Sequence, residues 1–185
     1  MAGATYEALH LFEILLRNAM DREIKAWNAA QGYSETWLLT PDPRLKKLLE
    51  PATLAKAQQR AMVVARRDGR DQLHDDVLAQ MTFATWRYLL PSNTSIPKQR
   101  LWTAATMFAF PVWNAGWEPI VRRIESIHEL RNRVAHLEPL HRGNLRRARQ
   151  SMRQMAYAFG PEASAIFREK ERMLPLIIEL ENATA

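Results

Sequence analysis

The sequence predicts an all-α fold in a single domain that spans residues 1–185. Apolar residues recur every three or four positions along most of the chain, which is the spacing of one helix face, and no stretch alternates as a half-buried strand does. Proline and glycine stand between the periodic stretches and divide them into separate helices. A chain of 185 residues fits one domain and is long enough to bury most of its apolar surface.

The N-terminal half of the chain contains four predicted helices. Gln31-Gly32-Tyr33-Ser34 ends the first, Pro51 suits the first turn of the second, and Pro91 and Pro111 end the third and fourth. Pro41-Asp42-Pro43 marks a loop or a short turn. In order, these helices run from Tyr6 to about Ala29, from Pro51 to the stop at Asp68-Gly69, from about Asp75 to Leu90, and from Lys98 to about Phe110.

Three further helices are predicted in the C-terminal half. Gly116 precedes the first of them, Gly143-Asn144 caps the second, and Gly160-Pro161 separates the second from the third. They run from Glu118 to Leu140, where Pro139 ends the helix, then from Leu145 to about Phe159, and finally from just after Pro161 to about Leu180. The six tryptophans stand mostly among apolar residues, which favours core packing over the stacking of bases.

The predicted helix from Glu118 to Leu140 has two unlike faces. Its apolar stripe consists of Ile120, Ile124, Ile127, Leu130, Val134 and Leu137. The opposite face carries Glu125, His128, Asn132 and His136, with Glu129 beside them and Arg131 on the flank. Surface helices usually present lysine and glutamate in such positions, so this face is the candidate site.

Composition favours an anionic partner. The net charge is +6, and arginine supplies more of it than lysine, which favours nucleic acid over a membrane because guanidinium forks match phosphate oxygens. The alternative is that the charge serves only solubility. Without cysteine the chain has no disulfide, thiolate nucleophile or zinc–cysteine site. The N-terminal stretch carries charged residues inside its apolar run, and no segment reaches the roughly 20 apolar residues of a membrane span, so a cytoplasmic protein is expected.

Arginine recurs at helical steps directly after the candidate site. The residues are Arg142, Arg146, Arg149 and Arg153. They indicate contacts with phosphates, or else an ordinary solvated basic face.

Several kinds of catalysis have no support in the sequence. His128 and His136 are eight residues apart, about 12 Å along a helix, which is too far to share one metal ion. No serine stands in a Gly-x-Ser-x-Gly turn, and the few glycines form no phosphate-binding loop. We therefore expect neither a metal nor a cofactor.

Arg131, Asn132 and His136 remain as a set that could cleave RNA. Histidine exchanges protons near neutral pH, and arginine neutralises charge that develops on a phosphate. The Asn132 amide could hold the imidazole or a phosphate oxygen. The ribose 2′-hydroxyl would be the nucleophile, so DNA would not be a substrate. On spacing alone, a histidine paired with Glu125 or Glu129 on a solvated helix is the competing interpretation.

The six residues from Arg131 to His136 resemble the signature of the HEPN superfamily, in which an arginine and a polar residue precede a histidine near the end of a helix. Ile127-His128-Glu129-Leu130 and Leu137-Glu138-Pro139-Leu140 resemble more narrowly its Abi-like branch, of the AbiD/AbiF abortive-infection type. Leu11 to Ala19 and Met81 to Leu90 also agree with this branch, so the resemblance spans most of the chain.

The resemblance implies a HEPN-like helical bundle, metal-independent endoribonuclease activity and a homodimer with a composite active site. Arg131 and His136 would be catalytic, and Asn132 would support them. Glu13, Arg17 and Asn18 match a first-helix block of the family, so they would support the site or contact RNA, as would His128. Leu137 and Glu138 depart from the family, which often has a second histidine and, in nucleotidyltransferase-controlled members, a tyrosine at these places.

The leading hypothesis is thus an RNase of anti-phage abortive infection or of a toxin–antitoxin pair, with an antitoxin or a regulatory RNA as further candidate partners. The alternative is a non-catalytic HEPN module that binds a guide or regulatory RNA.

Overall fold

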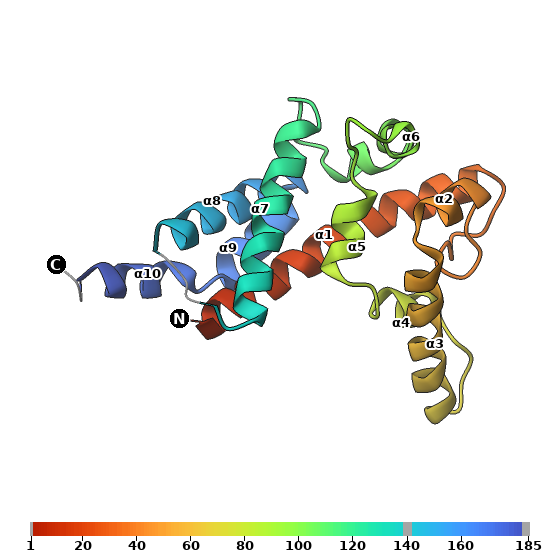
Figure 1. The fold of residues 1–185 in the computed structure, drawn as a ribbon, viewed down its shortest axis with the longest axis horizontal. Coiled ribbons are helices and arrows are strands. Elements are labelled where there is room, and N and C mark those ends of the chain that lie inside the picture. Colours follow the sequence, from red (N-terminus) through yellow and green to blue (C-terminus); the bar gives the residue numbers. More distant parts are fainter. Residues whose placement is uncertain (1, 139–141, 183–185) are drawn as a thin grey trace. The chain divides into compact units, whose positions relative to one another are not determined.

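Every regular element in the described part of the chain is a helix (Figure 1). The computed structural model describes residues 2–138 and 142–182. The elements are α1 (Ala2–Ala30), α2 (Pro43–Leu48), α3 (Pro51–Arg67), α4 (His74–Leu78), α5 (Phe83–Leu89), α6 (Ile96–Ala104), the 3-10 helix η1 (Thr106–Ala109), α7 (Glu118–Ala135), α8 (Arg142–Ala158), α9 (Pro161–Lys170) and α10 (Met173–Asn182). The all-α prediction is confirmed, since the described residues form no strand.

The chain packs as two compact units. Unit 1 contains the residues up to Ala19 and those from Phe110 onward, and unit 2 contains Met20–Ala109. Helix α1 belongs to both units. Its residues up to Ala19 are part of unit 1, and those from Met20 onward are part of unit 2. That residues 1–185 form one domain stays a prediction.

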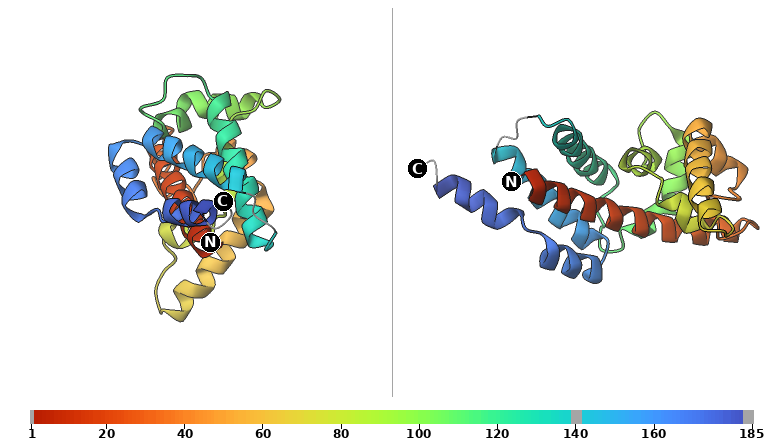
Figure 2. Two further views of the ribbon diagram at one scale, coloured as in Figure 1. Left: turned by 90° about the vertical axis from the view of Figure 1, so that its left-hand side faces the viewer. Right: turned by 90° about the horizontal axis from the view of Figure 1, so that it is seen from below.

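Helix α8 is the centre of unit 1, where it contacts α7, α9 and α10 (Figure 2). Helix α7 buries Ile120, Ile124 and Ile127 completely, as a stripe at three- and four-residue steps should. At the end of α8, the ring of Phe159 lies 5.8 Å from that of Phe12 and 5.4 Å from that of Phe110. This aromatic cluster joins the start of the chain to the segment that precedes α7.

Unit 2 is built around two tryptophans. Trp37 and Trp86 are fully buried, and their rings meet edge to face at 6.2 Å. The interpretation of tryptophan as core is confirmed for these two. The other four are half-buried, namely Trp27, Trp102, Trp113 and Trp117.

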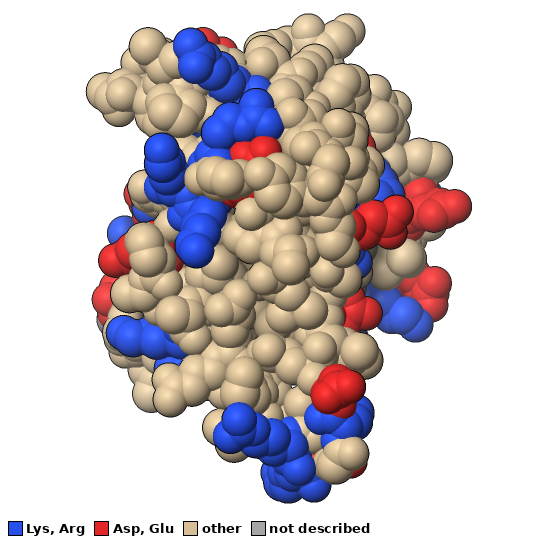
Figure 3. All heavy atoms as spheres, turned by 90° about the vertical axis from the view of Figure 1, so that its right-hand side faces the viewer, with Lys and Arg blue, Asp and Glu red and all other residues tan. Residues whose placement is uncertain are grey.

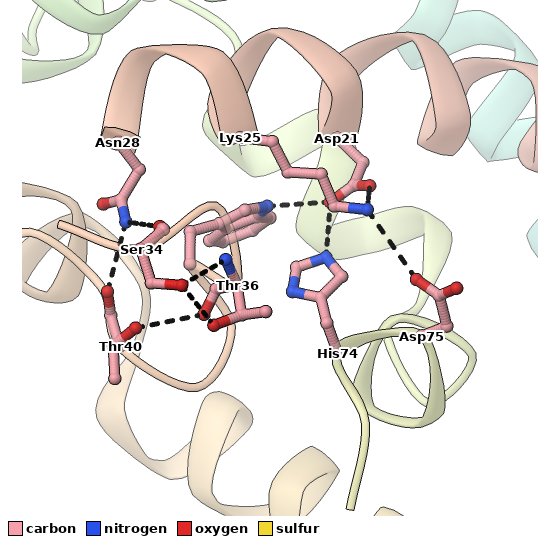
Figure 4. Close-up of polar contacts among 9 residues, drawn as sticks. Asp21, Lys25, Asn28, Ser34, Thr36, Thr40, His74 and Asp75 are labelled. Atoms are coloured by element: carbon pink, nitrogen blue, oxygen red, sulfur yellow. Dashed lines mark hydrogen bonds and ion pairs between the residues drawn. The ribbon is translucent and has the colours of Figure 1, made fainter. Parts of the chain in front are cut away.

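A buried carboxylate connects three segments of unit 2. Asp21 of α1 accepts hydrogen bonds from Trp37 Nε1 at 2.7 Å and from His74 Nε2 at 2.8 Å, and Lys25 Nζ lies 3.0 Å from it (Figure 4). Burial raises the pKa of Asp21, but the hydrogen bonds from His74, Lys25 and Trp37 outweigh burial and hold the pKa below its ordinary value. We call these four residues the Asp21 network.

Asn28 fixes the loop that carries Trp37. Its amide nitrogen donates to the carbonyl oxygens of Ser34 and Thr40 (Figure 4). Its amide oxygen accepts from the backbone N–H of Asp42. The predicted loop or turn at 41–43 leads into α2, where the side chain of Asp42 accepts from the N–H of Arg44 and caps the helix.

Three predicted helices are interrupted. The helix predicted from Asp75 to Leu90 is two helices, because Thr82 has the extended backbone (φ −95°, ψ 161°) that lets both Met81 and Phe83 be buried. The helix predicted from Lys98 to Phe110 divides at Ala105 into α6 and η1. The last predicted helix divides at Glu171, whose extended backbone ends α9.

Two predicted helix ends are also wrong. Helix α7 ends at Ala135 rather than at Pro139 or Leu140, for reasons given below. Helix α8 begins at Arg142, so Gly143-Asn144 falls in its first turn instead of breaking the chain. Pro139 and Leu140 lie outside the described residues.

Asp21→Asn should lower the free energy of unfolding at pH 7 by about 3 kcal/mol, because it removes the charge on which two buried donors and Lys25 converge. Urea denaturation measures the change. Asp75→Asn is the matched control, since its carboxylate is 80% exposed and 3.7 Å from the same Lys25, and should cost less than about 1 kcal/mol.

The Asp21 effect has a defined pH dependence. A folded-state pKa below the unfolded value stabilises the protein above the unfolded pKa, near 4, and the stabilisation is lost as pH falls through the folded pKa. The difference between wild type and Asp21→Asn should therefore shrink below about pH 4. A difference that stayed constant down to pH 2 would contradict the assignment.

Candidate functional site

The end of helix α7 is closed by three backbone hydrogen bonds. The N–H of His136 donates to Asn132 O at 2.9 Å, that of Leu137 to Val134 O at 3.2 Å, and that of Glu138 to Arg133 O at 2.9 Å. The last two make a Schellman motif with His136 as the C-cap. Leu137 has φ 55°, the left-handed conformation that glycine usually supplies at this place.

This closure corrects the predicted apolar stripe. The stripe holds from Ile120 to Val134, which are buried, but the side chain of Leu137 is 88% exposed. A further helical turn would have kept Leu137 on the buried face. Because the backbone reverses at Leu137, its side chain leaves the core.

The three predicted catalytic residues lie within the last turn and cap of α7. Arg131 and Asn132 are half-buried on the helix, and His136 is exposed at the cap. Within the part of the chain that the structure describes, no side-chain hydrogen bond or ion pair engages any of the three. The predicted supporting residue His128 is half-buried two turns earlier.

The predicted first-helix residues lie on the part of α1 that belongs to unit 1. Glu13 and Arg17 are half-buried, and Asn18 is exposed. No ion pair joins Glu13 to Arg17 in the described structure, although the two residues are one turn apart. Instead, Arg17 Nε is buried without a hydrogen-bond partner among the described residues.

A cavity of about 910 Å³ opens in unit 1 and is lined by arginines. Its floor contains Phe167 and Ile177, both buried, and its wall includes Trp113 and Tyr157. No aspartate or glutamate of the described chain lines it. The arginines come from α7, α8 and α9, and they are Arg123, Arg146, Arg149, Arg153 and Arg168. We call this the arginine cavity.

The arginine cavity contains some predicted residues and some that sequence reasoning missed. Arg146 and Arg149 were predicted to bind RNA, and Arg153 belongs to the same helical series. Arg142 begins α8, but its side chain lies outside the described part of the structure. Arg123 and Arg168 were missed, because no spacing rule connects α7 or α9 to the series on α8.

Neutral groups fix the guanidinium of Arg123. Its Nε donates to Gln154 Oε1 at 2.9 Å, one terminal nitrogen donates to Pro119 O at 3.1 Å, and the group lies 5.3 Å from the ring of Trp113. The indole nitrogen of Trp113 in turn donates to Gly116 O at 2.9 Å. Arg123 is thus held in place without losing its charge to a carboxylate.

The charge of Arg149 is matched inside the protein. Its Nε lies 2.9 Å from Glu171 Oε2, and the side chains are 16% and 3% exposed. The second carboxylate oxygen accepts from the N–H groups of Met173 and Leu174 at the start of α10. Arg149 therefore joins α8 to the α9–α10 connection. Glu171 neutralises the guanidinium that was expected to contact RNA.

The arginine cavity and the cap of α7 are separate places on unit 1. Arg123 and Ala135 stand at two ends of the same straight stretch of helix, about 18 Å apart at 1.5 Å per residue. Within one protomer, Arg123 is therefore not next to His136. A ligand that contacted both would have to extend along α7.

Unit 2 presents a different surface. On the face seen from the side of α2 and α3, Lys and Arg side chains gather at the upper left and at the bottom, and most of the centre carries no charge (Figure 3).

Comparison of the chain with protein-family models, with curated proteins and with solved structures gives no match. Among the described residues, no three or more His, Asp and Glu side chains group closely enough to hold a metal ion. Nor does any helix in the described ranges combine the length and hydropathy needed to cross a bilayer.

Leu137→Gly should raise the free energy of unfolding by about 0.5–1 kcal/mol, because glycine adopts the left-handed conformation without strain and the exposed leucine side chain has little packing to lose. Urea denaturation measures it. Ala135→Gly, also exposed but inside α7, should have the opposite sign. A destabilised Leu137→Gly variant would contradict the observed end of α7.

Arg149→Ala should destabilise the protein by about 3 kcal/mol, because it leaves the buried carboxylate of Glu171 without its cation. Arg153→Ala removes an exposed arginine of the same helix and should change the free energy of unfolding by less than about 0.5 kcal/mol. Thermal melts of the two variants at pH 7 compare them. Equal changes in melting temperature for the two variants would show that the Arg149–Glu171 pair contributes nothing to stability.

Proposed function

We propose that the chain is a metal-independent endoribonuclease of the HEPN type that acts in the cytoplasm, in anti-phage abortive infection or as a toxin. One observation carries the proposal: Arg131, Asn132 and His136 share the last turn and cap of α7, and none of their side chains is engaged by the described protein. A guanidinium and an imidazole held at the end of a rigid helix are suited to phosphodiester cleavage.

The reaction uses the ribose 2′-hydroxyl as its nucleophile. The 2′-oxygen forms a bond to the adjacent phosphorus, and the bond from phosphorus to the 5′-oxygen breaks. His136 takes or delivers the proton that passes from the 2′-oxygen to the leaving 5′-oxygen. Arg131 neutralises the charge on the phosphorane, while Asn132 holds the imidazole or a phosphate oxygen. The products are a 2′,3′-cyclic phosphate and a 5′-hydroxyl.

A second copy of the chain completes this proposal. One α7 cap supplies one imidazole, whereas the reaction uses both a base and an acid. A two-fold axis that brings two caps together supplies both, because each protomer contributes the same patch. The exposed position of His136 leaves it accessible to such a partner. An antitoxin or a regulatory RNA would restrain the activity by covering the same patch.

His136→Ala and Arg131→Ala should each reduce cleavage of single-stranded RNA by about 10²–10⁴-fold in the presence of EDTA, because each removes a group that acts in the transition state. Gel electrophoresis of end-labelled RNA measures the rate and identifies the cyclic phosphate. Arg133→Ala is the control, since it alters an exposed arginine of the same turn outside the proposed set. Cleavage that requires added metal, or that survives both substitutions, excludes the proposal.

Non-catalytic RNA binding is the second candidate, and the arginine cavity favours it. Its arginines come from three helices, and the one on α7, Arg123, lies about 18 Å along that helix from the proposed catalytic cap. A binding module would retain RNA with strong salt dependence but would leave the strand intact. The cleavage experiment therefore separates the two candidates.

A further inference from the structure

The arginine cavity has the composition of an anion site. It gathers guanidinium groups from three helices over an apolar floor, and no carboxylate of the described chain lines it. Arg149 is matched by Glu171, but Arg153 and Arg168 are exposed and make no ion pair with any described residue. Guanidinium groups that no carboxylate matches repel one another, and a bound anion would relieve this repulsion.

Part of this site is already fixed in position. Gln154, the carbonyl of Pro119 and the ring of Trp113 hold Arg123 without neutralising it. A cation that is held by neutral groups needs little reordering when an anion arrives, so binding loses less conformational entropy. Such an arrangement is typical of a ligand site and is unusual for an arginine that serves only solubility.

Two further features narrow the chemical class of the ligand. The volume of about 910 Å³ lies within the range of pockets that take small organic ligands and exceeds what a simple inorganic anion needs. Tyr157 lines the cavity and is 59% exposed, so its ring is accessible to a planar group. Bases stack on aromatic rings, and guanidinium forks match phosphate oxygens.

We propose that the arginine cavity binds a nucleotide, with its phosphate against Arg123, Arg153 and Arg168 and its base on Tyr157. This binding site is distinct from the Arg131–His136 set and requires no cleavage. The nucleotide could be free or one unit of a single strand of RNA, because both present the same phosphate and base. The experiment below separates these sources.

Binding is measured in a His136→Ala background, so that failure of the proposed catalysis does not affect the result. The probes are ATP, whose binding is measured by isothermal titration calorimetry, and a 5′-fluorescein-labelled eight-nucleotide RNA, whose binding is measured by fluorescence anisotropy. Arg153→Gln/Arg168→Gln removes two cavity charges, and Tyr157→Leu removes the stacking ring. Arg66→Gln/Arg67→Gln, at the exposed end of α3 in unit 2, is the control of equal net charge.

The cavity double variant should bind at least one of the two probes about tenfold or more weakly, while the α3 control should bind as the parent does. For the RNA, the plot of log binding constant against log salt concentration should become less steep by about 1.4, which corresponds to the loss of two phosphate contacts to a single strand. Tyr157→Leu should weaken binding by roughly tenfold through lost stacking. Thermal melts check that each variant is folded.

The pattern of binding identifies the source of the nucleotide. Saturable ATP binding that the cavity variants abolish assigns a free nucleotide, whereas binding of the RNA alone assigns a strand. Binding of neither probe to the parent overturns the proposal. So does equal weakening by the cavity and α3 double variants, because charge alone would then explain the affinity.

Discussion

The early end of helix α7 is the constraint on which the candidate site depends. Three hydrogen bonds close the helix at His136, and a leucine adopts the left-handed conformation directly after it. If the helix continued, His136 would lie on its surface and Leu137 would extend the buried stripe. The closure instead places the imidazole at a cap, next to the backbone reversal at Leu137. A strained residue beside three unengaged polar side chains is the kind of local conflict that functional sites retain.

Rules that act over one or two turns predicted much of this fold. The stripe from Ile120 to Val134 is buried as its spacing indicates, and Pro51 and Gly69 bound α3 as expected. The rules failed where burial of neighbouring side chains decided the backbone. Thr82 is a residue type common at helix N-caps, but it stands inside an apolar run, and its extended backbone goes with the burial of both Met81 and Phe83. Leu137 also gives no sign in the sequence that it replaces the usual glycine.

The site was predictable to the extent that its residues share a helix. Arg131, Asn132 and His136 could be grouped from spacing, and so could the arginines of α8. The partners of these residues could not, because they depend on tertiary position. Arg149 was expected to be available to RNA, but Glu171, 22 residues later, matches its charge. Arg123 became part of the arginine cavity only because α7 packs against α8, where Gln154 receives its hydrogen bond.

The arginine cavity differs from the arginines of unit 2 in how its charges are matched. Unit 2 pairs Arg44 with Asp42 and Arg70 with Asp76, and the hydrogen bonds from Arg70 lower the pKa of Asp76 to about 2. These carboxylates neutralise the arginines that they pair with, so the paired arginines contribute little to the positive electrostatic potential at the surface. In the arginine cavity, neutral groups hold Arg123, and no described carboxylate lines the wall. Local pairing rather than net charge therefore distinguishes the arginine cavity, because unit 2 carries the larger share of the net charge of +6. An RNA bound at Arg123, as proposed, would lie about 18 Å along α7 from the cap, so one helix would connect the proposed binding site with the proposed cleavage site.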